Sequence, residues 1–224
     1  MSTGKGISQE GLKLIACSTM LIDHIGAVFF PQFQGLRILG RLSFPIYCFL
    51  LAEGIHHTRN PVKYGLRLLL VAVLAELPYD LLFYGELTLA HNSVMVTLLL
   101  GFLAGCTIKH CHGWTKLPAS LPFIMLGDWA CGSYGEEGVI MVVLLLLTRD
   151  IPFQKRIQFL LMTLLSLQMA GFPDRIGIQF YAVAAMIPIT LYSGEKRSHN
   201  KTMQWAFTLF YPLHILILLM IRDF

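Results

Sequence analysis

The chain has 224 residues and a formal net charge of +4, and 55% of its residues are hydrophobic while only 13% are charged. Soluble domains carry charges at roughly a quarter of their positions, so this composition excludes an ordinary water-soluble domain. The basic residues are spread among short loops, which argues against nucleic acid as a partner. The sequence therefore predicts an all-α, polytopic integral membrane helical bundle in which residues 1–224 form a single domain.

Hydropathy predicts about nine transmembrane helices, because roughly 20 apolar residues are needed to cross the hydrocarbon core of a bilayer. They lie near residues 12–30, 36–56, 64–84, 91–109, 118–133, 137–148, 157–171, 176–192 and 204–222. The fifth and sixth are short and predict either two tilted helices or one broken hairpin. The first lacks a small-residue cleavage site, so we expect a retained span rather than a removed signal peptide.

Loop charge predicts the orientation, since cytoplasmic loops carry an excess of Lys and Arg. Most basic residues fall at the N-terminus and in the loops that share its side of the membrane: Lys5, Lys13, Arg59, Lys63, Arg67, Lys109, Lys116, Arg149, Lys155, Arg156, Lys196, Arg197 and Lys201. The opposite side holds Arg37, Arg175 and Arg222. We therefore expect a cytoplasmic N-terminus and an external C-terminus.

Several polar residues interrupt the predicted spans. Asp23 and His24 lie in the outer half of the first span, and Arg41 lies near the outer end of the second. Glu76 and Asp80, four residues apart in the third span, share one helix face. Ionisable groups at such depth face a polar interior and pair with one another, so we expect a polar pocket toward the outer leaflet.

Further polar residues reach a similar outer depth in the remaining spans. Asn92 opens the fourth span, Asp128 lies in the outer part of the fifth, Tyr134 and Glu136 follow in an external turn, and His214 lies mid-depth in the ninth. Three prolines, Pro45, Pro78 and Pro212, lie near polar residues of these spans. Because proline has no backbone N–H to donate, we expect kinks or loosened turns at these positions.

A second cluster, EGIHHTRNPVKYGLR (residues 53–67), lies between the second and third spans on the cytoplasmic side. Its polar side chains are candidates for binding a phosphate-bearing donor: His57, Arg59, Asn60, Lys63 and Arg67. Ordinary positive-inside topology would also produce this composition. The stretch KHCHGW (residues 109–114) offers too few ligands for a zinc site, and the five cysteines, Cys17, Cys48, Cys106, Cys111 and Cys131, fit no redox or zinc spacing.

Several ordered stretches resemble the TraX family of F-type conjugal-transfer pilin acetylases. They are LKLIACSTMLIDHIG, GRLSFPIYCFLLAEGIHHTRNPVKYGLRLLL, AELPYDLL, HNSVMVTLLLG, YGEEGV and YPLH. The family is similar to a wider group of membrane acyltransferases that use cytoplasmic acetyl-CoA. The resemblance implies a bacterial multi-pass inner-membrane enzyme that acetylates the N-terminal amine of a membrane-inserted pilin subunit, or another amine or sugar acceptor.

N-acetylation requires a base near the acceptor amine, and His24 is the expected base because imidazole titrates near neutrality. Asp23 is adjacent in sequence but about 100° around the helix, so it is expected to pair elsewhere, for example with Arg41. Glu76 or Asp80 would then orient His24, while Arg41 would neutralise these acids or bind the acceptor. His214 is a second candidate base.

Acetyl-CoA is the expected donor, with its phosphates at the basic cluster, and no metal is expected. Asn92, Asp128, Tyr134 and Glu136 are expected near the acceptor. Two other functions stay open. Buried acids and histidines also serve proton-coupled transporters, although the chain has no repeated halves. A non-catalytic assembly factor of a conjugation or secretion system would use the same polar residues to hold its helices together.

Overall fold

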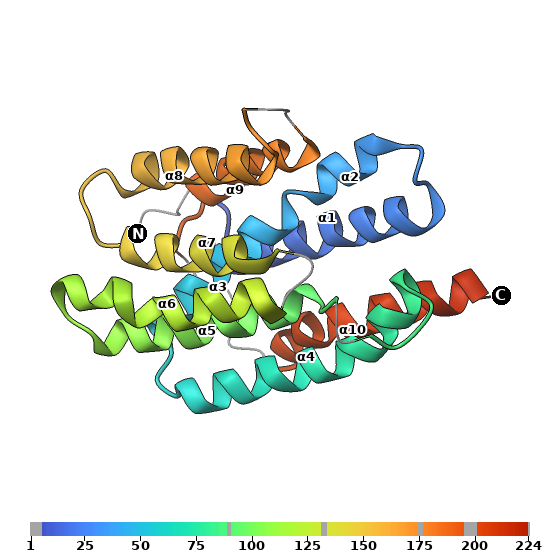
Figure 1. The fold of residues 1–224 in the computed structure, drawn as a ribbon, viewed down its shortest axis with the longest axis horizontal. Helices are drawn as coiled ribbons and strands as arrows, with labels where there is room; N and C mark the ends of the chain where they lie inside the picture. The colour runs from blue at the N-terminus through green and yellow to red at the C-terminus, as the bar shows by residue number, and fades with distance from the viewer. Residues whose placement is uncertain (1–5, 89–90, 131–133, 174–176, 195–200, 224) are drawn as a thin grey trace. The chain divides into compact units, whose positions relative to one another are not determined.

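The computed structural model describes residues 6–88, 91–130, 134–173, 177–194 and 201–223. Over these ranges it contains ten α-helices and two 3₁₀ helices (Figure 1), which confirms the all-α fold class. Lys5, Cys131, Arg175, Lys196 and Arg197, which entered the sequence predictions, lie outside the described residues.

The helices follow the predicted apolar segments closely. Their bounds are α1 Gln9–Phe29, α2 Gln34–Gly40, α3 Ser43–His57, α4 Pro61–Phe83, α5 Val94–His110, η1 Gly113–Thr115, α6 Lys116–Ala130, α7 Gly135–Leu147, α8 Gln154–Met169, η2 Ile178–Ala185, α9 Met186–Thr190 and α10 Lys201–Asp223. The segment predicted near 176–192 consists of a 3₁₀ helix followed directly by a short α-helix.

Three helical segments in the described part of the chain are long and apolar enough to cross a bilayer: Gln9–Phe29, Gln34–His57 and Thr202–Asp223. The length and apolar composition of these segments support the prediction that the chain is a membrane protein. The count of nine spans and the cytoplasmic N-terminus stay predictions.

The chain divides into two compact units. Unit 1 comprises Met1–Leu50 and Lys155–Phe210, and unit 2 comprises Leu51–Gln154 and Tyr211–Phe224. Both α3 and α10 contribute residues to each unit. The expectation of a single domain stays a prediction.

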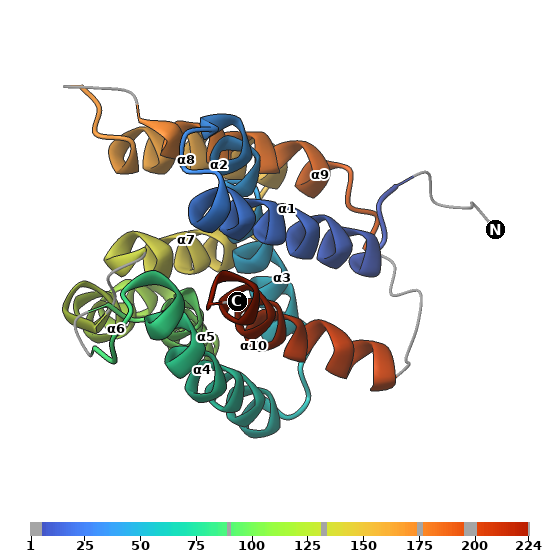
Figure 2. The ribbon, with the colours of Figure 1, turned by 90° about the vertical axis from the view of Figure 1, so that its right-hand side faces the viewer.

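In unit 1, α1 packs against α2 through its buried face (Figure 2). Ser8 caps the N-terminus of α1, where its hydroxyl accepts a hydrogen bond from the Gly11 N–H at 3.2 Å. Gly26 of α1 allows Leu36 of α2 to approach, because a Cβ at position 26 would lie 2.7 Å from the Leu36 Cβ. The chain thus turns back tightly on itself after α1.

The second predicted span is broken rather than continuous. Helix α2 ends at Gly40, and α3 begins at Ser43. Pro45 lies in the first turn of α3 and has no N–H to donate to the Arg41 carbonyl. The loosened backbone expected near Pro45 is therefore a break at Arg41 and Leu42, whereas Pro78 and Pro212 lie inside α4 and α10.

In unit 2, α5 packs against α4, α6 and α7 (Figure 1). Two glycines four residues apart on α5 permit the close approach of α7. A Cβ at Gly101 would meet Val142 at 2.9 Å, and one at Gly105 would meet Leu146 at 2.6 Å. Small residues with this spacing are typical of helix interfaces in membranes. Ala104 and Ile108 of α5 and Val139 and Val143 of α7 form a buried apolar cluster.

Large apolar side chains cover the outward faces of α4 and α6. On α4 the exposed residues recur at helical spacing: Val62, Leu66, Leu69, Leu70, Val73, Leu74 and Leu77. On α6, Leu117, Leu121, Met125 and Leu126 are exposed, and the exposed Trp114 and Trp129 lie close to the two ends of the helix. Contiguous apolar surface bordered by tryptophan is typical of contact with lipid.

Candidate functional site

Asp23 of α1 is held by two arginines in unit 1. Its two carboxylate oxygens each accept a hydrogen bond from Arg41 Nη2 at 2.8 Å, and its Oδ2 also accepts from Arg37 Nη1 at 2.9 Å. The Asp23 and Arg41 side chains are each only 12% exposed, while that of Arg37 is 29% exposed. The predicted pairing of Asp23 with Arg41 is confirmed.

Arg37 is a site residue that sequence reasoning missed. We counted it only among the basic residues of the external side, and it lies inside α2, one turn before Arg41. Besides the Asp23 carboxylate, Arg37 Nη1 also donates to the Asp23 backbone carbonyl at 3.2 Å. The spacing of four residues between the two arginines, both within the span predicted near 36–56, was the signal that they share a helix face.

Gly40 and Gln179 complete the surroundings of the Asp23–Arg41 pair. A side chain at position 40 would overlap the Asp23 carboxylate, so α2 can approach α1 this closely only with glycine there. Arg41 Nη1 donates to Gln179 Oε1 at 3.2 Å. The Gln179 Nε2 is buried without a hydrogen-bond partner among the described residues. Gln179 lies in η2, where hydropathy alone predicted an ordinary span.

His24 follows Asp23 on α1 and is half-buried. The hydrogen bonds described for the Asp23 carboxylate go to Arg37 and Arg41. Asp23 therefore supplies charge compensation within unit 1, as its angular offset from His24 predicted. Orientation of His24 by Glu76 or Asp80, which belong to unit 2, stays a prediction.

Glu76 and Asp80 lie one turn apart near the end of α4 and hold the chain that follows it. Glu76 Oε1 accepts from the Ser93 hydroxyl at 2.5 Å and from the Ser93 N–H at 3.1 Å. Asp80 Oδ2 accepts from the Thr88 N–H at 3.0 Å. Asp80 is 5% exposed, and its Oδ1 has no hydrogen-bond partner among the described residues.

His214 and Asn92 also belong to unit 2. His214 is 5% exposed on α10, with its ring centroid 5.6 Å from that of Tyr211. Asn92 precedes α5 and donates from Nδ2 to the Ala130 carbonyl at the end of α6. Asn92 thus ties α5 to α6, a structural contact that the sequence did not predict.

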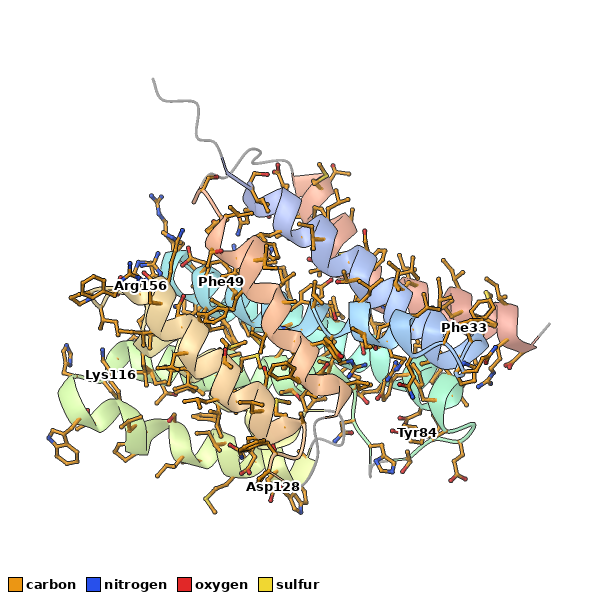
Figure 3. The ribbon with its side chains drawn as sticks, turned by 90° about the horizontal axis from the view of Figure 1, so that it is seen from above. Phe33, Phe49, Tyr84, Lys116, Asp128 and Arg156 are labelled. Carbon is orange, nitrogen blue, oxygen red and sulfur yellow. The ribbon has the colours of Figure 1, made fainter. Side chains whose placement is uncertain are left out.

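The remaining predicted acceptor residues lie where α6 gives way to α7. Asp128 is exposed near the C-terminal end of α6, and Lys116 is the first residue of the same helix (Figure 3). Tyr134 is the N-cap residue of α7, and Glu136 lies in the first turn of that helix. Acids in the first turn favour a helix through its dipole, so Glu136 has a structural role available besides any role in binding.

The C-terminal end of α3 carries a second ion cluster, within unit 2. Glu53 is 9% exposed and accepts from Arg149 Nε at 2.8 Å, and its Oε2 lies 3.4 Å from His57 Nε2. Lys109 Nζ donates to the carbonyls of Ile55 and His56, each at 3.1 Å. Burial lowers the pKa of Arg149, but hydrogen bonding and the Glu53 charge raise it by more, so Arg149 stays protonated.

Arg149 and Lys109 were predicted only as topology markers. The structure brings both to the end of α3 beside His57, one of the expected donor-binding residues. The others lie at the start of α4. Asn60 caps that helix by accepting from the Lys63 N–H at 2.9 Å, and Arg67 lies 5.5 Å from the Tyr64 ring centroid. Arg59 and Lys63 are exposed.

Among the described residues, no three His, Cys, Asp or Glu side chains are grouped closely enough to hold a metal ion. The prediction that the protein uses no metal stays a prediction. Chemically, the polar groups described above can hold anions and cations, accept protons and donate hydrogen bonds to a carbonyl oxygen.

Comparison with known proteins extends these observations. The family described as TraX protein matches residues 8–222. The chain is 28% identical to a "Probable fimbrial assembly protein FimC, serogroup H1" of Dichelobacter nodosus, over 97% of each chain. It is 29% identical to an uncharacterized protein of Rickettsia prowazekii (strain Madrid E), over 42% of this chain and 34% of that one. No solved structure matches the chain. Because the family match spans nearly all of the sequence, the chain belongs to the TraX family.

Proposed function

We propose that this protein is a multi-pass enzyme of the bacterial inner membrane that transfers an acetyl group from cytoplasmic acetyl-CoA to an amine. The favoured acceptor is the N-terminal amine of a membrane-inserted pilin-type subunit. The observation that carries the proposal is the match to the TraX family over residues 8–222. The relative named as a probable fimbrial assembly protein is consistent with a pilus-related acceptor.

In this proposal His24 is the general base. The neutral acceptor amine attacks the carbonyl carbon of the thioester, the carbon–sulfur bond breaks, and the CoA thiolate leaves. The proton released from the amine nitrogen passes to the His24 imidazole. A base positioned in this way contributes on the order of 10² to 10⁴ in rate. His214 is the alternative base.

Arg41 and Arg37 are proposed to stabilise the negative charge that develops on the thioester oxygen. Two guanidinium groups share the Asp23 carboxylate, and Asp23 directly precedes His24 in the chain. The arginines can therefore provide donors for the developing charge, and Asp23 keeps their long side chains ordered. The buried Gln179 Nε2 is a further donor in the same unit. Asp23 is thus a positioning residue rather than the base.

The CoA phosphates are proposed to bind at the cytoplasmic ends of α3 and α4. Arg59 and Lys63 are exposed there, His57 is held by Glu53 and Arg149, and Arg67 lies on the same helix face as Lys63. The proposal includes the nine-span topology with the N-terminus in the cytoplasm, because these basic residues must then face the compartment that contains acetyl-CoA.

A non-catalytic assembly factor is the second candidate, and the name of the Dichelobacter nodosus relative, a probable fimbrial assembly protein, favours it. Radiolabelled acetyl-CoA and a synthetic pilin-type peptide, incubated with the purified full-length protein in nanodiscs, distinguish the two. The enzyme predicts transfer of label to the peptide, a loss of at least about a hundredfold in His24→Ala, and normal transfer in the control His112→Ala, which alters an exposed loop residue. Saturable peptide binding without any transfer would favour the assembly factor.

A further inference from the structure

The acid pair of α4, Glu76 and Asp80, lies in an unusual electrostatic setting. Both carboxylates project from one helix face near the end of an apolar helix, and only 5% of the Asp80 surface is exposed. Buried carboxylates are stable only when a cation or several hydrogen bonds compensate them. The ion pairs found among the described residues include neither Glu76 nor Asp80.

The basic residues of α4 lie far from the acid pair, and the arginine that contacts this end of α4 is engaged elsewhere. Lys63 and Arg67 lie in the first two turns of α4, and the rise from Arg67 to Asp80 is about 20 Å at 1.5 Å per residue. Arg222 of α10 donates to the carbonyls of Leu81 and Leu82, at 3.0 and 2.6 Å, and pairs with Asp223. Arg222, which contacts this end of α4, therefore compensates backbone carbonyls and another acid.

Hydrogen bonds compensate the two acids unequally. Glu76 accepts from both the hydroxyl and the N–H of Ser93, whereas Asp80 accepts from the Thr88 N–H through Oδ2 alone. Asp80 Oδ1 is buried and has no partner among the described residues. A buried carboxylate oxygen without a partner can accept one more hydrogen bond, and a positively charged donor would also balance the negative charge of the carboxylate.

We infer that Glu76 and Asp80 bind the ammonium group of the acceptor before acetylation, with Asp80 Oδ1 as the principal acceptor. This inference deepens the proposed function and rests on it. An α-ammonium group carries three N–H donors and one positive charge, so it supplies both the hydrogen bond and the countercharge that the acid pair requires. Specificity for a free amine would then come from α4.

A purely structural role is the competing explanation. The two acids fasten Thr88 and Ser93 to the end of α4, and Glu76 also favours the N-terminus of α5 through its helix dipole. Neutral amides separate the explanations, because Glu76→Gln and Asp80→Asn keep hydrogen-bond acceptors while they remove the charge. Ser93→Ala does the reverse: it removes a hydrogen bond to Glu76 and keeps both charges.

The test measures peptide binding to the full-length protein in nanodiscs, without acetyl-CoA and in choline chloride. The probe is a synthetic pilin-type peptide with a free N-terminus, compared with the same peptide acetylated at its N-terminus. We expect the free peptide to bind at least about tenfold more tightly than the acetylated peptide. Hydrogen bonds between charged groups contribute enough free energy for an affinity difference of this size. Asp80→Asn and Glu76→Gln should lose this preference, while Ser93→Ala and the exposed-loop control Glu86→Gln should keep it.

Equal binding of the two peptides by the unaltered protein would overturn the inference, as would retention of the preference in Asp80→Asn. Loss of the preference when sodium chloride replaces choline chloride would also overturn it, because the acids would then be an inorganic cation site. Thermal unfolding of each variant verifies its fold. Acetyl transfer, measured separately, keeps the proposed function distinct: transfer without charge-dependent binding rejects only the ammonium site.

Discussion

The guanidinium group of Arg41 donates from Nη2 to both carboxylate oxygens of Asp23, each at 2.8 Å. This pair joins α1 to the break between α2 and α3, where the backbone leaves its helical hydrogen-bonding pattern. Arg37 and Gln179 extend the network from α2 and η2. Polar side chains at such a break explain how unit 1 accommodates charge inside apolar helices.

Asp23→Asn is expected to destabilise the protein, because two guanidinium groups lose their common countercharge in a largely buried site. Breaking a buried ion pair from one side costs on the order of 3–5 kcal/mol. Thermal unfolding in detergent measures the loss. Glu10→Gln, in the first turn of the same helix, removes an acid that favours the helix dipole, and its expected cost is about 0.3–1 kcal/mol. Equal effects of the two substitutions would contradict the importance of the Asp23 network.

Gly40→Ala is expected to abolish acetyl transfer and lower stability, since the added methyl group would overlap the Asp23 carboxylate and push α2 away from α1. Gly35→Ala is the matched control in the same helix, because a Cβ there meets nothing within 4 Å. Gly35→Ala should leave activity unchanged and stabilise α2 slightly, by about 0.5–1 kcal/mol at most. An active Gly40→Ala variant would show that close approach at Gly40 is unnecessary.

Arg149→Met is expected to destabilise unit 2 by on the order of 3 kcal/mol, because Glu53 would remain buried without its guanidinium partner. Adding Glu53→Gln to this variant should recover most of the loss, since no uncompensated charge would then be buried. Chemical denaturation of the single and double variants forms a complete cycle. Additive losses would mean that the two side chains do not depend on each other.

His112→Cys and Asp128→Cys test the predicted topology at the two ends of α6. Both positions are exposed and flank the tryptophan-bordered apolar face of that helix. In intact cells a membrane-impermeant thiol reagent should label position 128 and should reach position 112 only after permeabilisation. The reverse labelling would place the basic ends of α3 and α4 outside the cell and reject the proposed donor site.

Much of the fold follows from the sequence, because long apolar segments in a membrane protein must form helices. The nine predicted segments correspond to helical segments, and the angular offset between Asp23 and His24 predicted that Asp23 would pair away from its neighbour. The break at Arg41 was anticipated only as loosening near Pro45. Hydropathy averages over many residues and so does not resolve a two-residue interruption.

The tertiary partners of the charged residues were harder to predict. Arg37 and Arg149 were counted only as topology markers, yet each is paired with a mainly buried acid. These pairings depend on which helices lie side by side, and spacing along the sequence does not encode that. Gln179 was missed for the same reason, since it reaches Arg41 from 138 positions away.

Transfer across a sealed bilayer tests the central claim most directly. Proteoliposomes containing the full-length protein would receive acetyl-CoA on the side of the α3 and α4 basic ends, with a pilin-type peptide inserted so that its free N-terminus faces the opposite side. Mass spectrometry should then find the peptide acetylated at its N-terminal amine, and His24→Ala proteoliposomes should yield unmodified peptide. Peptide that stays unmodified with the unaltered protein, while acetyl-CoA binds normally, would contradict the account.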